Sequence, residues 1–173
     1  MPTPLETSAH DACLNSVLSR IQGLSIPLFD ADTAFPTDHM ILAKMPWVTR
    51  FFGPTAEGKL TPPGIIVSPL GFESFLGGTN RRDDIGYPAF VTIVVADNED
   101  VTDENLNAYT LWRQMISDGL RNQRLSVSLA TGDSVMTVSQ SDTEVAMPEI
   151  FTLGYWVSSL SFSCQVRKSR ANT

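Results

Sequence analysis

The feature that most constrains the fold is the segment at residues 87–96, which is apolar on both of its alternating faces. The residues of one parity, which share one face of an extended chain, are Tyr87, Ala89, Val91, Ile93 and Val95. Those of the other parity are Phe90, Thr92 and Val94. Because strand side chains alternate between the two faces of a sheet, both faces here need a cover. The segment therefore predicts a central strand, and Pro88 lies near its start, where a missing N–H is tolerated.

Two helices are predicted from apolar residues that recur at helical spacing. The first covers about residues 9–22, with Ser8 opening a variant of the capping box and Gly23 placed to end the helix. Its apolar face consists of Leu14, Val17, Leu18 and Ile21. The second covers about residues 103–123, and the acidic residue Asp103 suits a helix N-terminus. Its apolar residues are Tyr109, Trp112, Ile116 and Leu120.

Further strands are predicted at residues 64–68, which are β-branched, and at 155–166, which alternate between apolar and polar. Residues 39–48, and chiefly 40–43, are apolar enough for a strand, but Pro46 breaks it. Residues 51–64 are rich in glycine and proline, as in a loop. Residues 125–147 contain two alternating pieces and are interpreted as an insert or hairpin. The outline is a single α+β domain over residues 1–173, an antiparallel or mixed sheet with two main amphipathic helices packed on it.

Composition indicates a globular chain, because 42% of the residues are hydrophobic and 18% are charged. The formal net charge of −7 disfavours a nucleic-acid-coating protein, although an acidic surface is compatible with a conduit through which DNA slides. Cys13 and Cys164 are predicted to be two buried thiols. The N-terminus has no signal-peptide pattern, and no window is apolar enough for a membrane span, so folding in a cytoplasm is expected.

No residue pattern predicts an enzyme, a cofactor or a metal site. The pair Gly77 and Gly78 lacks the spacing and the lysine of a phosphate-binding loop. The two histidines, His10 and His39, each neighbour an aspartate, but no spacing brings a third ligand to them. We therefore expect a chain that is not an enzyme and that holds neither a cofactor nor a metal ion.

Residues 64–69, 78–88 and 90–95 resemble the small tail-terminator and tail-completion proteins of long-tailed bacteriophages. In that family a short strand with a proline exit leads into a long polar loop. A segment of the type N-x-x-D-x-I-x-Y-P, which matches residues 80–88 here, then enters the central strand. An amphipathic helix and a last strand follow. The 125–147 segment departs from the family pattern, which leaves a neighbouring head–tail connector subunit as an alternative.

The resemblance implies a structural virion protein of the tail or neck, assembled in the host cytoplasm. Such proteins form rings, often hexamers, that terminate the tail tube and join it to the head connector. The implied partners are other copies of the chain, the tail tube protein and the head–tail connector or adaptor proteins. Genomic DNA would pass through the lumen without specific binding, and no membrane is involved. The alternatives are a small non-viral α+β binding module or an enzyme of unknown ligand, and a host-encoded interaction module.

The predicted subunit or partner interface is a polar loop at residues 71–86 together with the start of a basic C-terminal tail that we expect to be frayed. Its candidate residues are Phe72, Phe75, Leu76, Asn80, Arg81, Arg82, Asp83, Asp84, Arg167 and Lys168. Exposed aromatic residues often anchor interfaces, but the loop phenylalanines could equally fold back into the domain core. The basic clusters could be a solvated surface or a docking site for an acidic partner or DNA. The two aspartates are expected to be solvated in a turn.

Overall fold

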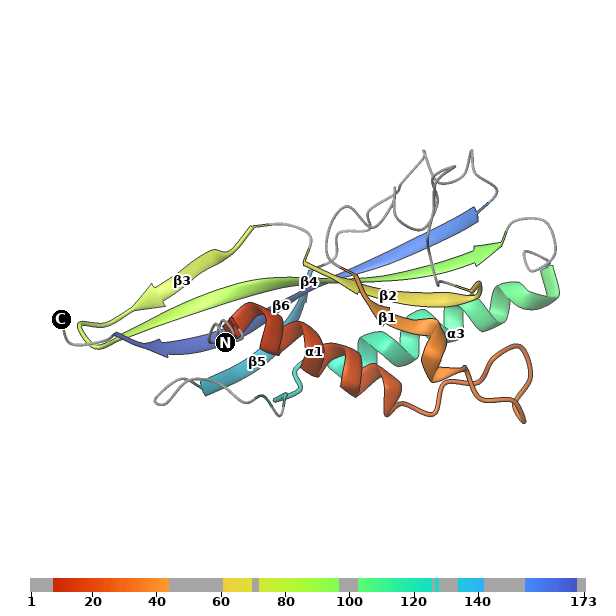
Figure 1. The fold of residues 1–173 in the computed structure, drawn as a ribbon, viewed down its shortest axis with the longest axis horizontal. Coiled ribbons are helices and arrows are strands. Elements are labelled where there is room, and N and C mark those ends of the chain that lie inside the picture. Colours follow the sequence, from red (N-terminus) through yellow and green to blue (C-terminus); the bar gives the residue numbers. More distant parts are fainter. Residues whose placement is uncertain are drawn as a thin grey trace, which may run out of the picture.

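A computed structural model describes residues 8–43, 61–69, 72–96, 103–125, 127, 134–141 and 155–170. The described chain forms a six-stranded sheet with two α-helices on one face, so the α+β prediction is confirmed (Figure 1). The strands are β1 (Met40–Leu42), β2 (Gly64–Ser68), β3 (Ser74–Gly78), β4 (Arg82–Ala96), β5 (Ser134–Ser141) and β6 (Tyr155–Ser169). The helices are α1 (Ala9–Gln22) and α3 (Asp103–Leu120), and η1 (Thr37–His39) is a short 3-10 turn.

The sheet is mixed and has the strand order β1-β2-β4-β6-β5. β1 runs parallel to β2, and every other pairing is antiparallel. β4 is central, as its apolar faces predict, because it pairs with β6 along its whole length and with β2 on its other edge. β3 continues along that same edge of β4, from Ser74↔Gly86 to Gly78↔Asp83.

Both helices pack on the same face of the sheet and enclose the core there. Ser8 caps α1 by accepting a hydrogen bond from the Asp11 backbone N–H, and Gly23 ends the helix, as the sequence indicates. α3 ends at Leu120, three residues before the predicted end, and Asn122 adopts a φ of 59° that is typical of a helix terminus. At the centre of the core, Trp112 has no exposed surface, and its ring contacts those of Phe35, Phe29 and Tyr109.

The structure corrects the prediction that residues 71–86 are a loop. Ser74–Gly78 forms β3, and β4 begins at Arg82 and not at Tyr87. The backbone groups of this segment therefore pair within the sheet. Residues 167–170 are not frayed either, because β6 continues to Ser169 and the Arg170 N–H donates to the Arg81 carbonyl at 2.9 Å.

The 125–147 segment contributes a strand to the main sheet. Ser134–Ser141 forms β5 and pairs with β6. Asn122 N–H donates to the Val138 carbonyl, and Val138 N–H donates to the Gln123 carbonyl, so the chain after α3 returns to the sheet beside β5. Leu125 and Val127 lie outside any strand, and residues 126, 128–133 and 142–147 lie outside the described residues. The predicted 51–60 part of the loop and Pro46 also lie outside them.

Candidate functional site: a projecting arm

Three strands extend beyond the helices at one end of the molecule. We define the arm as residues 72–86 and 165–170, which comprise β3, the first part of β4 and the last part of β6 (Figure 1). At its base, Ile85 and Val166 still contact the core that α1 covers. Its end is the turn between β3 and β4, closed by a hydrogen bond from Thr79 N–H to the Arg82 carbonyl at 2.7 Å. The candidate interface residues from the sequence all belong to this arm.

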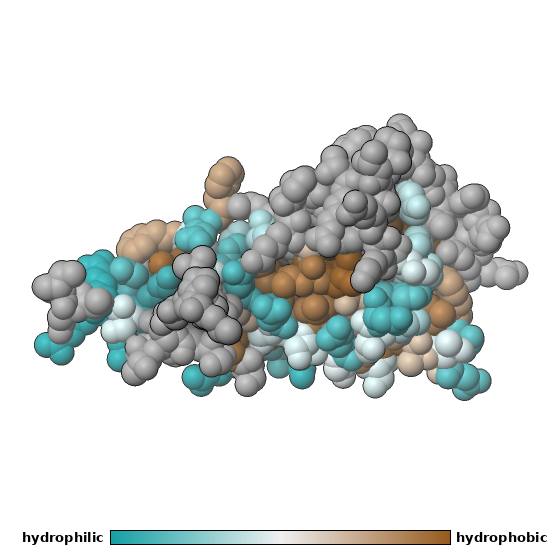
Figure 2. Space-filling view, in the orientation of Figure 1, coloured by the Kyte–Doolittle hydropathy of each residue, from teal (hydrophilic) through white to brown (hydrophobic). Residues whose placement is uncertain are grey.

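The arm exposes three large apolar side chains. Phe72 is 96% exposed, Phe75 69% and Leu76 48%. The alternative in which these phenylalanines fold back into the core is therefore wrong for both. Figure 2 shows apolar side chains standing among hydrophilic ones over the β3 region. Exposed aromatic and aliphatic side chains on a projecting part of a sheet are typical of a protein–protein contact.

Two ion pairs join β4 to the end of β6 and stiffen the arm. The Arg167 guanidinium donates to both carboxylate oxygens of Asp84, at 2.7 and 2.9 Å. Arg170 binds Asp83 in the same way, with Arg170 Nη2 2.5 Å from Asp83 Oδ1. The expectation that these aspartates are solvated in a turn is therefore wrong: each has an arginine partner more than eighty residues away in the chain.

Hydrogen bonds from the arginines lower the pKa of Asp84 and that of Asp83 below the usual value for aspartate. Because the folded pKa values are depressed, the ion pairs stabilise the arm above the unfolded aspartate pKa of about 3.9, and this contribution is lost as the pH falls through the folded values. The arm should therefore open locally in mild acid before the rest of the sheet does.

Amide hydrogen exchange tests this local opening. Between about pH 5 and about pH 3, and after correction for intrinsic exchange, amides of β3 and of β6 near Arg167 should lose protection relative to those of β2. Asp83→Asn/Asp84→Asn should show the lowered arm protection already at the higher pH. An arm-to-β2 protection ratio that stays constant over this range would contradict the role assigned to the ion pairs.

The remaining candidate residues surround the end of the arm. Asn80, Arg81 and Arg82 are exposed at the β3–β4 turn. Lys168 lies on the helix side of β6, where its Nζ is 5.5 Å from the centre of the Tyr87 ring. The structure thus brings all ten candidate residues into the arm, where seven of them lie in paired strands and Phe72, Asn80 and Arg81 lie outside the strands.

A second surface, which the sequence did not single out, lies at the other end of the molecule. A shallow pocket of about 240 Å³ forms between α3 and the segment that follows α1. We call it the Phe29 pocket; it is lined by Pro27, Leu28, Phe29, Asp30, Ala31, Asn107, Ala108 and Leu111. The Trp112 indole N–H fixes this segment by donating to the carbonyls of Pro27 and Leu28, at 2.6 and 3.2 Å. The apolar run from Ile26 to Phe29 was its only signal in the sequence.

The histidines and cysteines have structural surroundings. His10 Nε2 is 2.7 Å from the Pro88 carbonyl oxygen and its ring stacks on Tyr87, while His39 Nδ1 is 3.0 Å from the Pro63 carbonyl oxygen. Cys13 and Cys164 are both buried and free, which confirms the predicted thiols, and the hydrogen bond with Cys13, together with burial, raises the pKa of Cys164. In the described part of the chain, no three histidine, cysteine, aspartate or glutamate side chains are grouped to hold a metal ion. Within that part, no helix is long and apolar enough to cross a membrane.

Comparison with known proteins gives a structural likeness without a sequence relative. No protein-family model matches the chain, and no curated protein matches it. Among solved structures, a chain from the virion of a native gene transfer agent particle superposes with a TM-score of 0.55 at 11% sequence identity. The superposition covers 94% of this chain and 100% of that chain. At this identity the likeness establishes a shared fold over nearly the whole chain.

Proposed function

We propose that this protein is a structural subunit of a phage-like virion, and that it forms a ring at the head–tail interface. In this role it terminates the tail tube and joins it to the head connector. The observation that carries the proposal is the fold that the chain shares, over 94% of its length, with a component of a gene transfer agent virion. The resemblance of residues 80–88 to tail-terminator proteins independently favours the tail end of the neck.

The arm supports a role in assembly. Three large apolar side chains that are strongly exposed on the arm are more typical of an interaction site than of a surface that faces only water. The bidentate pairs of Asp84 with Arg167 and of Asp83 with Arg170 hold the arm in one conformation. A preorganised arm loses less conformational entropy on docking than a loop would, so it is suited to a repeated contact between subunits or with the tail tube.

The charge of the chain is consistent with a ring through which DNA passes. The formal net charge is −7, so a lumen lined by the average surface of this protein would repel the phosphate backbone. Repulsion keeps DNA from adhering while it moves through the ring. We therefore assign the protein partners to the arm and no sequence-specific DNA contact to the chain.

Removal of the gene from the genome that encodes it tests the proposed function. Electron microscopy of the resulting particles should show full heads separated from tails, and tails of irregular length. Supplying the chain in trans should restore joined particles, and the restored particles should contain it at the neck. Complete, joined particles without the chain would contradict the proposal and would favour a binding module outside the virion.

A further inference from the structure

We infer that the Phe29 pocket receives the arm of a neighbouring copy of the same chain, so that subunits associate head to tail. The inference rests on the proposed function, because a ring subunit needs one repeated contact with its neighbour. It goes further by naming both halves of that contact. It is carried by three observations: the size and lining of the pocket, the distribution of exposed apolar side chains, and the charges on the two surfaces.

The size and lining of the Phe29 pocket suit a side chain of another protein. Its volume of about 240 Å³ lies below the roughly 300–1,000 Å³ of typical small-molecule sites. Leu28, Phe29, Ala31 and Leu111 provide an apolar lining. Its floor is rigid, because the Phe29 ring rests 5.5 Å from the Trp112 ring in the buried aromatic cluster. A rigid apolar hollow of this size is suited to an aromatic anchor.

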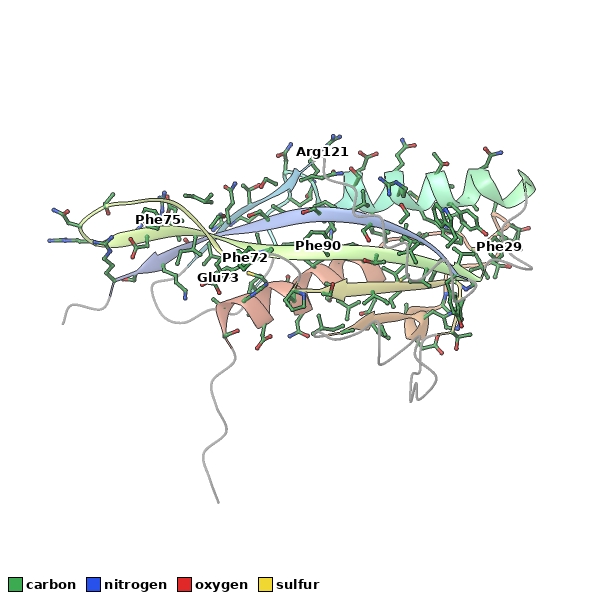
Figure 3. All side chains as sticks on the ribbon, turned by 90° about the horizontal axis from the view of Figure 1, so that it is seen from above. Phe29, Phe72, Glu73, Phe75, Phe90 and Arg121 are labelled. Carbon is green, nitrogen blue, oxygen red and sulfur yellow. The ribbon has the colours of Figure 1, made fainter. Side chains whose placement is uncertain are left out.

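The exposed apolar side chains identify the partner surface. Over the described residues, the large hydrophobic side chains that are strongly exposed are Phe72, Phe75, Leu76 and Leu111. The first three lie on the arm, and the fourth lies at the rim of the Phe29 pocket. Figure 3 shows Phe75 and Phe29 toward opposite ends of the long axis, so an arm cannot reach the pocket of its own chain. A second copy brings the two apolar surfaces together.

The charges of the two surfaces are complementary. The arm carries five cationic and three anionic residues, and Arg81 and Arg82 stand exposed at its end. The segment at residues 24–36, which forms one wall of the pocket, carries Asp30 and Asp32 and no lysine or arginine. Hydrogen bonds from Thr33 lower the pKa of Asp30, so this carboxylate stays ionised well below neutral pH. The arm end and the pocket wall therefore attract each other.

This contact has the geometry that a ring requires. The two surfaces are different and lie at opposite ends of the chain, so their association is heterologous. Each subunit has one arm and one pocket. When the rotation between neighbours closes a ring, every pocket holds the arm of a neighbouring subunit. A dimer with two-fold symmetry would instead bring identical surfaces together.

Mixing two variants that are each defective in one half of the contact tests the inference. Phe72→Ser/Phe75→Ser removes the anchors of the arm, and Leu111→Arg places a cation at the pocket rim. Both changes are at exposed residues, and circular dichroism should confirm that each variant is folded. Sedimentation velocity from about 10 µM to about 1 mM, a range that reaches millimolar affinities, measures association of each variant, of their mixture and of the unaltered chain.

The unaltered chain should form oligomers, and each variant alone should stay monomeric. An equimolar mixture should form dimers and nothing larger, because the intact arm of one variant fills the intact pocket of the other. The inference is overturned if the Leu111→Arg chain associates like the unaltered one, if the mixture stays monomeric, or if the unaltered chain is monomeric throughout. None of these results bears on particle assembly after gene removal, so the proposed function is judged separately.

Discussion

Replacing Trp112 by alanine should lower the free energy of unfolding by about 3–5 kcal/mol, the usual cost of truncating a large aromatic residue in a packed core. Trp112 has no exposed surface, and its ring packs edge-on against Phe35 with 5.0 Å between centroids. Its indole N–H also binds the carbonyls of Pro27 and Leu28, at 2.6 and 3.2 Å. The variant therefore loses packing and leaves two partly buried carbonyls without this donor. Urea denaturation followed by circular dichroism measures the change.

Trp112→Phe separates the two contributions, because phenylalanine keeps an aromatic ring in the cluster and removes only the indole donor and part of the volume. Its cost should be smaller, about 1–3 kcal/mol for the unsatisfied carbonyls. It should also loosen the wall of the Phe29 pocket more than the distant arm, which hydrogen exchange of the Leu28 and Phe35 amides would detect. A shift of the alanine variant's urea midpoint no larger than that of an exposed substitution would show that Trp112 lies outside the core.

The local part of the fold could be predicted because its determinants lie close together in sequence. The Ser8 cap and the apolar face of α1 are contained within fourteen residues of one another, and α1 begins and ends where they indicate. Residues 87–96 contain their own evidence for a central strand, since both parities are apolar. In each case the short-range pattern and the tertiary environment agree, and such agreement is what makes a pattern predictive.

The arm could not be predicted as a sheet because its stability comes from distant residues. Arg81, Arg82, Asp83 and Asp84 look like a polar turn when only their neighbours are considered. The strand conformation that begins at Arg82 depends on pairing with β6, including Asp84↔Arg167 and Asp83↔Lys168. The arginines that neutralise the aspartates are more than eighty positions away. Tertiary context therefore overrides the turn preference of these residues.

The residues of the candidate site could be identified from the sequence, but their arrangement in space could not. Phe72, Phe75 and Leu76 were recognised as apolar residues in polar surroundings, yet whether they are buried depends on what covers the two faces of the sheet beyond the helices. The Phe29 pocket went unrecognised because it forms only where α3 meets the segment after α1, through contacts such as that of Phe29 with Tyr109. Concave surfaces between distant elements leave no periodic pattern in a sequence.

Reversing the charge of Arg81 and Arg82 together should weaken self-association by roughly tenfold or more without unfolding the chain, because like charges facing each other across an interface repel. Both side chains are exposed at the end of the arm, and the bond from Arg170 N–H to the Arg81 carbonyl uses only the backbone. Arg81→Asp/Arg82→Asp would place two carboxylates against Asp30 and Asp32 of the neighbouring copy. Sedimentation equilibrium measures the change in dissociation constant, and circular dichroism verifies folding.

The matched control is Arg121→Asp/Arg124→Asp, which changes the net charge equally at two exposed residues after α3, away from both the arm and the Phe29 pocket. It breaks only the exposed pair of Arg121 with Asp118, at 3.4 Å, and such pairs contribute little to stability. Adding Asp32→Arg to the arm variant should restore attraction and recover part of the affinity, and Asp30 is kept because its carboxylate accepts the hydrogen bonds that hold residues 30–33. If the control weakens association as much as the arm variant does, the effect belongs to net charge and not to the end of the arm. If the arm variant associates normally, Arg81 and Arg82 take no part in the contact, and the apolar anchors alone must position the neighbouring subunit.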